Sequence, residues 1–499
     1  MRLTVDLQCV LSLMGTVVKW LSLPLLVPLF VALGRGNSGY PFVVTILLCS
    51  VIGFLLERLD RDPDLGLKES FLLESLAWLS VAIMGALPYI IEGQGTISTP
   101  VNAFFESMSG FTTTGATVMA NISLEDHSHA LMIWRQLTQW LGGMGIIVLG
   151  IAILPRMSVG GSELIKAEAP GPDVERLTPR IVETARRLWF IYALLTLLLF
   201  VFLYGSHLSG YAPDMDLFNS VAHVFTTMPT GGFSPEARSI EAFSPLVQWI
   251  IIPFMFLAGT NFALQWYCLT GSPGKLLKDT EFLTYLGAIV GSATFLYGLL
   301  IVGGPFASVS ETVRHSLFQI LTIVTTTGYA SHDFNTWGSM SQTLLFILMF
   351  LGGCAGSTGG GIKVMRWLTT VKMFGRELFQ AAFPRSIRSI RVGGNVIPDS
   401  TVRRIMSLIL LYVFTFFIGT LLIEFDAYRV GMELDTVEVM TSVAACLGNI
   451  GPGLGAVGPM NNYLFFSPVS KLILSFLMWA GRLELFTLFV ILIPRYWRV

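Results

Sequence analysis

The chain alternates between long apolar segments and short stretches rich in Thr, Ser and Gly. A helix needs about 20 consecutive apolar residues to cross a bilayer. The segments that approach this length are 7–33, 41–56, 71–91, 131–154, 188–204, 246–269, 282–302, 343–368, 405–423 and 469–493. The pattern predicts an all-α polytopic membrane protein with about ten spanning helices.

A shorter apolar piece, 103–117, lies between two of these segments and ends in a run of small residues. It is too short to cross a bilayer, so we expect it to dip into the membrane and return. Irregular backbone at that depth is tolerated only where it lines a protein cavity or a water-filled pore. Gly permits positive φ there, and Thr adds a hydroxyl to its backbone carbonyl. A ring of such oxygens can replace the hydration shell of an alkali cation.

The chain supplies three more copies of this piece, at 218–234, 316–331 and 437–453. In each copy a helix-length apolar stretch leads into a turn that contains glycine. The aligned glycines are Gly115, Gly232, Gly328 and Gly451. Their regular separation is the signature of an internal repeat. The third copy contains Thr-Thr-Gly-Tyr, which is close to the Thr-Val-Gly-Tyr-Gly filter run of potassium channels.

These repeats divide the chain into five units. An N-terminal hairpin of two transmembrane helices at 1–60 has no counterpart later in the chain. Four pore repeats follow, at 61–160, 161–275, 276–395 and 396–499. We therefore predict four helix–pore loop–helix repeats, like those of potassium channels, around one pore.

Composition supports a membrane protein and argues against other classes. Hydrophobic residues make up 53% of the chain and charged residues 13%, against about 25% charged residues in soluble domains. The net charge of −1 offers nothing to nucleic acid. Five scattered cysteines without ligand spacing predict neither disulfides nor zinc. No Ser/His/Asp, metal-ligand or Walker pattern occurs, so we do not expect an enzyme.

Basic residues set the predicted orientation. Lys and Arg gather in the linkers 155–187 and 363–404 and at the C-terminal end, and such loops face the cytoplasm. Both termini are then cytoplasmic, and all four glycine turns lie at the outer face. Acidic residues of the outer loops would attract cations, or they are simply solvated loop charges. These residues are Glu125, Asp126, Asp214, Asp216, Glu236, Glu241, Asp333, Glu433 and Asp435.

A run of glycines interrupts the predicted helix 343–368. Each Gly costs roughly 1 kcal/mol of helix stability relative to Ala, so we expect the helix to unwind there. An unwound segment at that depth must face a cavity, which favours a flexible gate below the filter over a packing surface of small residues. The candidate gate residues are Gly352, Gly353, Gly356, Gly359, Gly360 and Gly361.

Three polar side chains break the apolar pattern. Arg482 lies near the middle of the predicted helix 469–493, where a charge is functional by default. It is either a barrier to cations or half of a salt bridge to another helix, and Glu484 is not its partner because positions i and i+2 face apart. We expect Glu106 to anchor its loop by hydrogen bonds rather than to bind ions. We expect His223 to be a satisfied polar residue rather than a proton relay.

Several long motifs are distinctive, among them FFESMSGFTTTGAT, TGGFS, GGCAGSTGGGIKVMR, LGNIGPGLG and GRLELFTL. Together they resemble motifs of the Trk/Ktr/HKT superfamily of cation transporters, most closely its bacterial Trk-type branch. The resemblance extends from about residue 7 to residue 495. The additional N-terminal hairpin fits the Trk branch better than the shorter Ktr branch.

The resemblance implies potassium uptake across a bacterial inner membrane, with K⁺ bound by backbone just before each aligned glycine. The matching positions are Thr113, Thr114, Thr230, Gly231, Thr326, Thr327, Asn449 and Ile450. Gly115 favours potassium, since plant relatives with Ser at this position transport sodium, whereas Asn449 departs from the Thr pattern. The Gly run matches the family's intramembrane gate loop, and Arg482 matches its basic position. The resemblance also implies a homodimer with a TrkA-like cytosolic nucleotide-binding subunit.

Two alternatives remain at this stage. A sodium-permeable carrier, or a sodium- or proton-coupled symporter, would have the same fold. A secondary solute carrier would bind its substrate near the membrane midplane between inverted repeats with paired broken helices. The sequence argues against such a carrier, because all four repeats share one orientation and only one helix is expected to be strongly broken.

Overall fold

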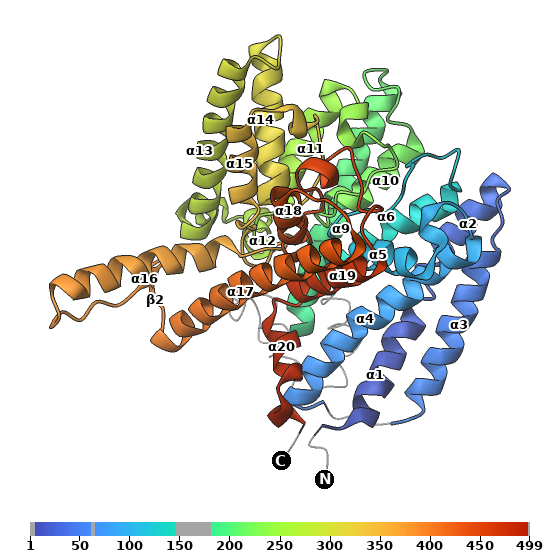
Figure 1. Cartoon of the computed structure of the whole chain (residues 1–499), viewed down its shortest axis with the longest axis horizontal. Helices are drawn as coiled ribbons and strands as arrows, with labels where there is room; N and C mark the ends of the chain where they lie inside the picture. The colour runs from blue at the N-terminus through green and yellow to red at the C-terminus, as the bar shows by residue number, and fades with distance from the viewer. Residues whose placement is uncertain (1–4, 61–64, 146–180, 498–499) are drawn as a thin grey trace.

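The computed structural model describes residues 5–60, 65–145 and 181–497 of the chain, and these residues are mostly helical (Figure 1). The single β-hairpin among them pairs β1 (Arg391–Val392) with β2 (Asn395–Val396) in antiparallel fashion. The predicted all-α membrane fold is confirmed. Short 3₁₀ helices lie at Thr96–Ser98, Ser239–Ala242, Pro273–Lys278, Phe334–Thr336, Gly455–Val457 and Pro494–Tyr496.

The N-terminal segment forms three helices. They are α1 (Leu7–Trp20), α2 (Leu26–Arg35) and α3 (Tyr40–Glu57). Helices α1 and α3 pack so closely that a Cβ on Gly53 would lie 2.7 Å from the Gly15 carbonyl oxygen. Small residues permit this approach of two membrane helices. The expected first span is therefore two helices, because a turn at residues 21–25 separates α1 from α2.

Each repeat begins with a long apolar helix. These helices are α4 (Leu67–Glu92), α9 (Ile181–Leu208), α13 (Thr280–Gly303) and α17 (Asp399–Val430). Together with α3 they are the five helices, within the described residues, that are long and apolar enough to cross a membrane by themselves. Two bent helix pairs would raise the number of spans to seven.

A short, largely buried pore helix follows the first helix of each repeat, as the sequence predicts. The four are α5 (Pro100–Phe111), α10 (Leu217–Thr227), α14 (Val309–Val324) and α18 (Thr436–Leu447). Their starts carry good helix signals: Pro100 occupies the first turn of α5, and Asp435 and Glu438 form a capping box on α18. Each helix ends at a glycine-containing turn.

The second helix is broken in three of the repeats, so the prediction of only one strongly broken helix is wrong. Helices α11 (Pro245–Ala258) and α12 (Phe262–Leu269) meet at 103°, and α19 (Pro468–Arg482) and α20 (Phe486–Leu492) at 114°. Helices α15 (Ser339–Leu348) and α16 (Val364–Ala382) are separated by the glycine run. In the first repeat α6 (His129–Gly143) is described, whereas 146–154 and the linker up to residue 180 lie outside the described residues.

The breaks follow local chemistry. The Asn261 side chain caps α12 by accepting a hydrogen bond from the Ala263 amide at 2.8 Å, which starts a new helix after Gly259. Before α20, Glu484 and Leu485 adopt positive φ values of 56° and 63°. Side chains other than Gly rarely adopt this conformation, so surrounding contacts must hold it.

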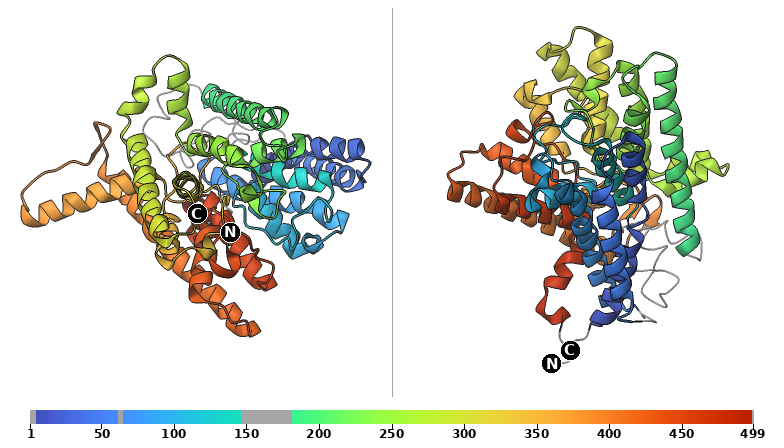
Figure 2. Two further views of the ribbon diagram at one scale, coloured as in Figure 1. Left: turned by 90° about the horizontal axis from the view of Figure 1, so that it is seen from above. Right: turned by 90° about the vertical axis from the view of Figure 1, so that its right-hand side faces the viewer.

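Seen from above, the parts of the chain succeed one another around the molecule, from blue and cyan through green and yellow to orange and red (Figure 2, left). Helices α1 and α20 lie at the same end (Figure 1), and Val5 and Tyr496 belong to one buried apolar cluster there. The much larger cluster joins all four repeats. The repeats therefore share one core, and their turns converge at its centre.

Candidate ion-conduction site

The four glycine turns share one backbone conformation. We call 113–115, 230–232, 326–328 and 449–451 turns 1 to 4. The first residue of each turn is not Gly but has a positive φ, between 54° and 59°. The glycine at the third position has a φ between 78° and 101°. Four recurrences of an uncommon conformation identify one structural motif repeated four times.

The amide of the middle residue in each turn bonds back to the pore helix that precedes the turn. The nitrogen of Thr114 donates to the Ser109 carbonyl at 2.8 Å, and that of Thr327 donates to the Thr322 carbonyl at 2.8 Å. The corresponding bonds of Gly231 and Ile450 measure 2.9 and 2.8 Å. The backbone amides of the middle residues are thus satisfied within each repeat, and the carbonyls of the same residues lie close to the glycine of a neighbouring turn.

The turns close into a ring, which we call the four-turn ring. A Cβ built on Gly115 would lie 2.3 Å from the carbonyl oxygen of Gly231, the middle residue of turn 2. A Cβ on Gly232 would lie 2.0 Å from the Thr327 carbonyl oxygen, and a Cβ on Gly328 would lie 1.8 Å from that of Ile450. Both oxygens belong to the middle residue of the next turn. A Cβ on Gly451 would lie 2.6 Å from the Thr114 oxygen, which returns the ring to turn 1. Only glycine leaves room for these approaches.

A cavity of about 380 Å³ opens on one side of the ring, and all four ring glycines line it. Two of the expected acidic residues, Asp126 and Glu236, also line the cavity, together with Arg135. The other acidic loop residues are not in its lining. Burial raises the pKa of the Glu236 carboxyl above its usual range, so this carboxyl is protonated more readily than an exposed one.

Residues 349–363, the Gly-rich loop, lie against the opposite side of the ring. The Gly360 amide donates to the Thr326 hydroxyl at 2.6 Å, and the Thr358 hydroxyl donates to the Met228 carbonyl at 3.1 Å. A Cβ on Gly360 would also lie 2.6 Å from the Gly448 carbonyl oxygen. The loop therefore contacts turns 2, 3 and 4 or the residues just before them, on the side away from the cavity.

Arg482 is the last residue of α19. The expectation that it lies near the middle of a helix is therefore wrong. Its guanidinium donates to the Thr358 carbonyl at 3.0 Å and to the carbonyls of Gly142 and Gly143 at 2.8 and 3.2 Å. It thus connects the Gly-rich loop to the end of α6. Glu484 forms an ion pair with Arg366 of α16, in agreement with the prediction that it is not the partner of Arg482.

The model of the TrkH family, described as cation transport protein, matches residues 39–498. The chain belongs to the TrkH family. It is 36% identical over 497 residues to the Trk system potassium uptake protein TrkH of Escherichia coli K12, an alignment that covers 98% of this chain and 99% of that protein. It is 35% identical over 503 residues to TrkH of Vibrio parahaemolyticus, with the same coverage.

The fold agrees with that family. The crystal structure of the potassium transporter TrkH from Vibrio parahaemolyticus superposes with a TM-score of 0.86 at 32% identity, and the match covers 99% of this chain and 100% of that chain. The resemblance that the motifs indicated is therefore confirmed along almost the whole chain.

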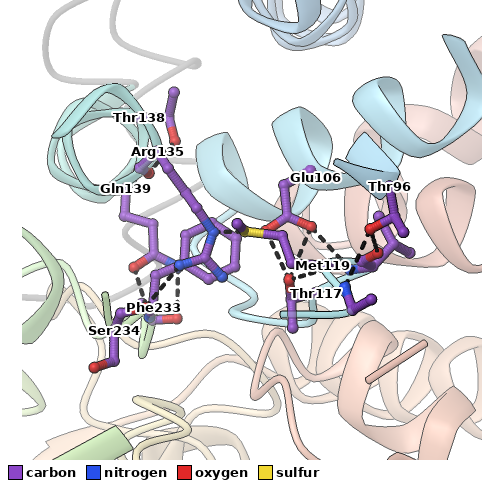
Figure 3. Close-up of polar contacts among 12 residues, drawn as sticks. Thr96, Glu106, Thr117, Met119, Arg135, Thr138, Gln139, Phe233 and Ser234 are labelled. Atoms are coloured by element: carbon purple, nitrogen blue, oxygen red, sulfur yellow. Dashed lines mark hydrogen bonds and ion pairs between the residues drawn. The ribbon is translucent and has the colours of Figure 1, made fainter. Parts of the chain in front are cut away.

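A buried ion pair supports turns 1 and 2 of this TrkH-family member (Figure 3). Arg135 Nε lies 2.7 Å from Glu106 Oε1, and both side chains are at most 2% exposed. Glu106 also accepts hydrogen bonds from the Thr117 hydroxyl and the Val118 amide, both at 2.9 Å. The prediction that Glu106 anchors its loop by hydrogen bonds is confirmed. Arg135 further donates to the Ser234 carbonyl at 3.0 Å, beyond turn 2.

Sequence reasoning missed Arg135 and Gln139, which lie on one face of α6. The Gln139 amide nitrogen donates to the Gly231 carbonyl at 2.7 Å, and its oxygen accepts from the Phe233 amide at 3.1 Å. A usable signal existed, because polar side chains within an apolar membrane segment are functional candidates by default.

The other junctions between turns are bridged by different side chains. The Tyr329 hydroxyl, after turn 3, lies 2.5 Å from the Thr226 hydroxyl, before turn 2. Asn335 exchanges two hydrogen bonds with the Gly455 backbone, at 2.9 and 3.0 Å, which joins the third and fourth repeats. The side-chain amide nitrogen of Asn449 donates to the Thr114 hydroxyl at 3.0 Å. Asn in place of Thr thus connects turn 4 to turn 1.

His223 has both ring nitrogens within hydrogen-bonding distance of partners. They lie 2.8 Å from the Asn219 carbonyl oxygen and 3.0 Å from the Ser234 hydroxyl. The expectation of a satisfied polar residue is confirmed. The pair with Ser234 holds the chain that leaves turn 2.

We predict that R135Q destabilises the protein strongly, because it leaves the Glu106 charge buried without its cation. Loss of one partner of a buried pair costs about 3–5 kcal/mol. The measurement is thermal unfolding in detergent. R238Q is the matched control: Arg238 is 61% exposed in its pair with Glu241, and exposed pairs contribute about 0–1 kcal/mol. Equal losses in the two variants would contradict the assignment of Arg135 as a structural support of the ring.

Proposed function

We propose that this chain is the potassium-conducting membrane subunit of a Trk-type uptake system. The observation that carries the proposal is the closed ring in which each turn glycine meets the middle carbonyl of the next turn. A ring of backbone oxygens from four repeats is the arrangement that replaces the hydration shell of K⁺ in potassium channels. The names of the family's relatives, Trk potassium uptake proteins, support the same ion.

In this proposal the ion enters from the cavity and passes the ring toward the Gly-rich loop. The proposed ion-contacting residues are Thr113, Thr114, Gly115, Thr230, Gly231, Gly232, Thr326, Thr327, Gly328, Asn449, Ile450 and Gly451. The bridges between adjacent turns keep the ring from collapsing onto a smaller ion. The side-chain hydroxyl and amide groups of these bridges therefore affect conduction indirectly, because they fix the position of the turn backbone.

We propose that the Gly-rich loop is the gate, with Gly352, Gly353, Gly356, Gly359, Gly360 and Gly361 supplying its freedom. Its contacts with three of the four turns support this role, because a loop in that position obstructs the exit from the ring. Arg482 acts mainly as an anchor, since its guanidinium donates to the carbonyls of Thr358 and Gly142. Its charge adds an electrostatic barrier to cations while the loop is closed.

We further propose a bacterial inner-membrane location with both termini in the cytoplasm, which the basic linkers support. A homodimer is supported by α16, which projects from the body (Figure 1) and exposes Phe374 and Leu378, at 54% and 75%. A cytosolic nucleotide-binding subunit would act on the gate from the same side. A secondary solute carrier loses its support, because the three helix breaks serve one ring rather than a pair of inverted sites.

Transport of rubidium, a potassium substitute, into proteoliposomes tests the proposed function. We expect uptake that potassium inhibits by competition and sodium does not. G328A is the inactive control, because its Cβ would lie 1.8 Å from the Ile450 carbonyl oxygen. Equal competition by sodium would favour a sodium-permeable or sodium-linked carrier of the same fold. Absence of uptake even with the cytosolic subunit present would refute the proposal.

We predict that G115S weakens the preference for potassium over sodium. Serine at a φ of 85°, with its Cβ 2.3 Å from the Gly231 carbonyl oxygen, must displace one of the ring oxygens. Permeability ratios in planar bilayers measure the effect. G205S is the matched control, since a Cβ on Gly205 in α9 meets no atom within 4 Å. A ratio unchanged in G115S would argue against the ring as the filter.

We predict that deleting Gly359 and Gly360 raises the flux, because the shortened loop no longer reaches turns 3 and 4. Rubidium uptake at equal protein density is the measurement. The control deletion removes two other glycines, Gly393 and Gly394, which form the turn between β1 and β2. These glycines lie away from the ring, so this deletion should leave the flux unchanged. A flux that stays constant or falls in the first variant, with normal expression, would remove the gate assignment.

A further inference from the structure

Glu281 is a buried carboxylate outside the ring. It is the second residue of α13 and is 3% exposed. Asp279 caps the same helix by accepting a hydrogen bond from the Phe282 amide at 2.7 Å. Glu281 is therefore not needed as the cap, and a buried carboxylate requires hydrogen bonds of its own.

The hydrogen bonds of Glu281 go to the middle of the Gly-rich loop and to the helix that follows it. One carboxylate oxygen accepts from the Ala355 amide, within the Gly-rich loop, at 2.7 Å. The same oxygen accepts from the Met365 amide, in the first turn of α16, at 3.1 Å. Lys363 lies close enough to act on this carboxylate electrostatically, as does Asp279. One side chain thus connects the middle of the loop to the start of α16.

Backbone amides fix most of the loop, because a run of glycines has little side-chain packing of its own. The Cys354 amide donates to the Gly259 carbonyl at 2.9 Å, and the Thr358 amide donates to the Ala258 carbonyl at 3.3 Å. At 2.7 Å, the bond from the Ala355 amide to Glu281 is shorter than either of these.

We propose that Glu281 is a positioning residue that latches the Gly-rich loop in its closed position. This inference rests on the proposal that the loop is the gate. Movement of the loop away from the ring would break the bond from the Ala355 amide, whereas the bond from Met365 of α16 keeps Glu281 in place, so Glu281 stabilises the closed position of the loop. A residue that interacts with only one of two states shifts the equilibrium between them. The latch acts from α13, behind the loop, and leaves the four-turn ring untouched.

Three substitutions test the latch. E281A removes the acceptor and E281D withdraws it by one methylene, whereas E281Q retains a carbonyl oxygen that can accept both amide bonds. Loss of one hydrogen bond shifts an equilibrium by up to about tenfold. We therefore expect E281A and E281D to raise basal rubidium flux by about that factor, with an unchanged potassium preference, and E281Q to behave as the parent protein.

Cys354 supplies a readout that does not depend on transport. It lies in the loop and is fully buried. The other four cysteines, Cys9, Cys49, Cys268 and Cys446, can be replaced by Ala. A water-soluble methanethiosulfonate reagent applied from the cytoplasmic side should then label Cys354 about tenfold faster in E281A and E281D than in the parent, in proportion to the open population.

D426A is the matched control. Asp426 is another buried carboxylate, 2% exposed, that accepts hydrogen bonds from Ser470 at the start of α19. Its loss should not speed labelling of Cys354. Labelling in E281A and E281D at the parental rate, or equally fast labelling in E281Q, would overturn the latch. Because labelling needs no ion flux, a failure of the potassium proposal would appear separately, as absent uptake in the parent protein.

Discussion

The close approach of each turn glycine to the next turn's carbonyl is the constraint on which the rest of the structure depends. It fixes the distance between repeats at the ring, so the pore helices must deliver their turns to within a few tenths of an ångström. A side chain in place of Gly328 would meet the Ile450 oxygen at less than the length of any ordinary contact. The positive φ of Thr113 and its equivalents, which costs about 1–3 kcal/mol at each position, is maintained because the interlocked neighbours leave no alternative.

The broken second helices follow from the same requirement. A loop can lie against the ring only if its backbone groups find partners away from water. The end of α11 supplies them: its terminal carbonyls at Ala258 and Gly259, free because the helix stops there, accept amides of the Gly-rich loop. In return, the Gly356 carbonyl accepts the first amide of α12, that of Phe262, at 3.1 Å. The break in repeat two and the loop of repeat three are therefore one hydrogen-bonded unit.

The sequence was sufficient for the features that repeat and insufficient for those that occur once. Four turns with Gly at equivalent places revealed the pore helices and the ring, and the Gly run revealed an unwound segment. The breaks near Gly259 and Glu484 were not predicted, because apolar residues on both sides of each break give the pattern of one continuous transmembrane helix. The groups that stabilise these breaks lie in other repeats. The sequence marks Arg135 and Gln139 only as polar residues within an apolar segment, and the fold alone places turn 2 against them.

A single chain of four unequal repeats allows each junction of the ring to be built differently. Four identical subunits would require four identical junctions. Here the junctions between turns use different groups: an ion pair at Arg135, the Tyr329 hydroxyl, and the amides of Asn335 and Asn449. Because each junction is specified by its own side chains, the second helices of repeats two, three and four can break in different ways while the four turns keep one backbone conformation.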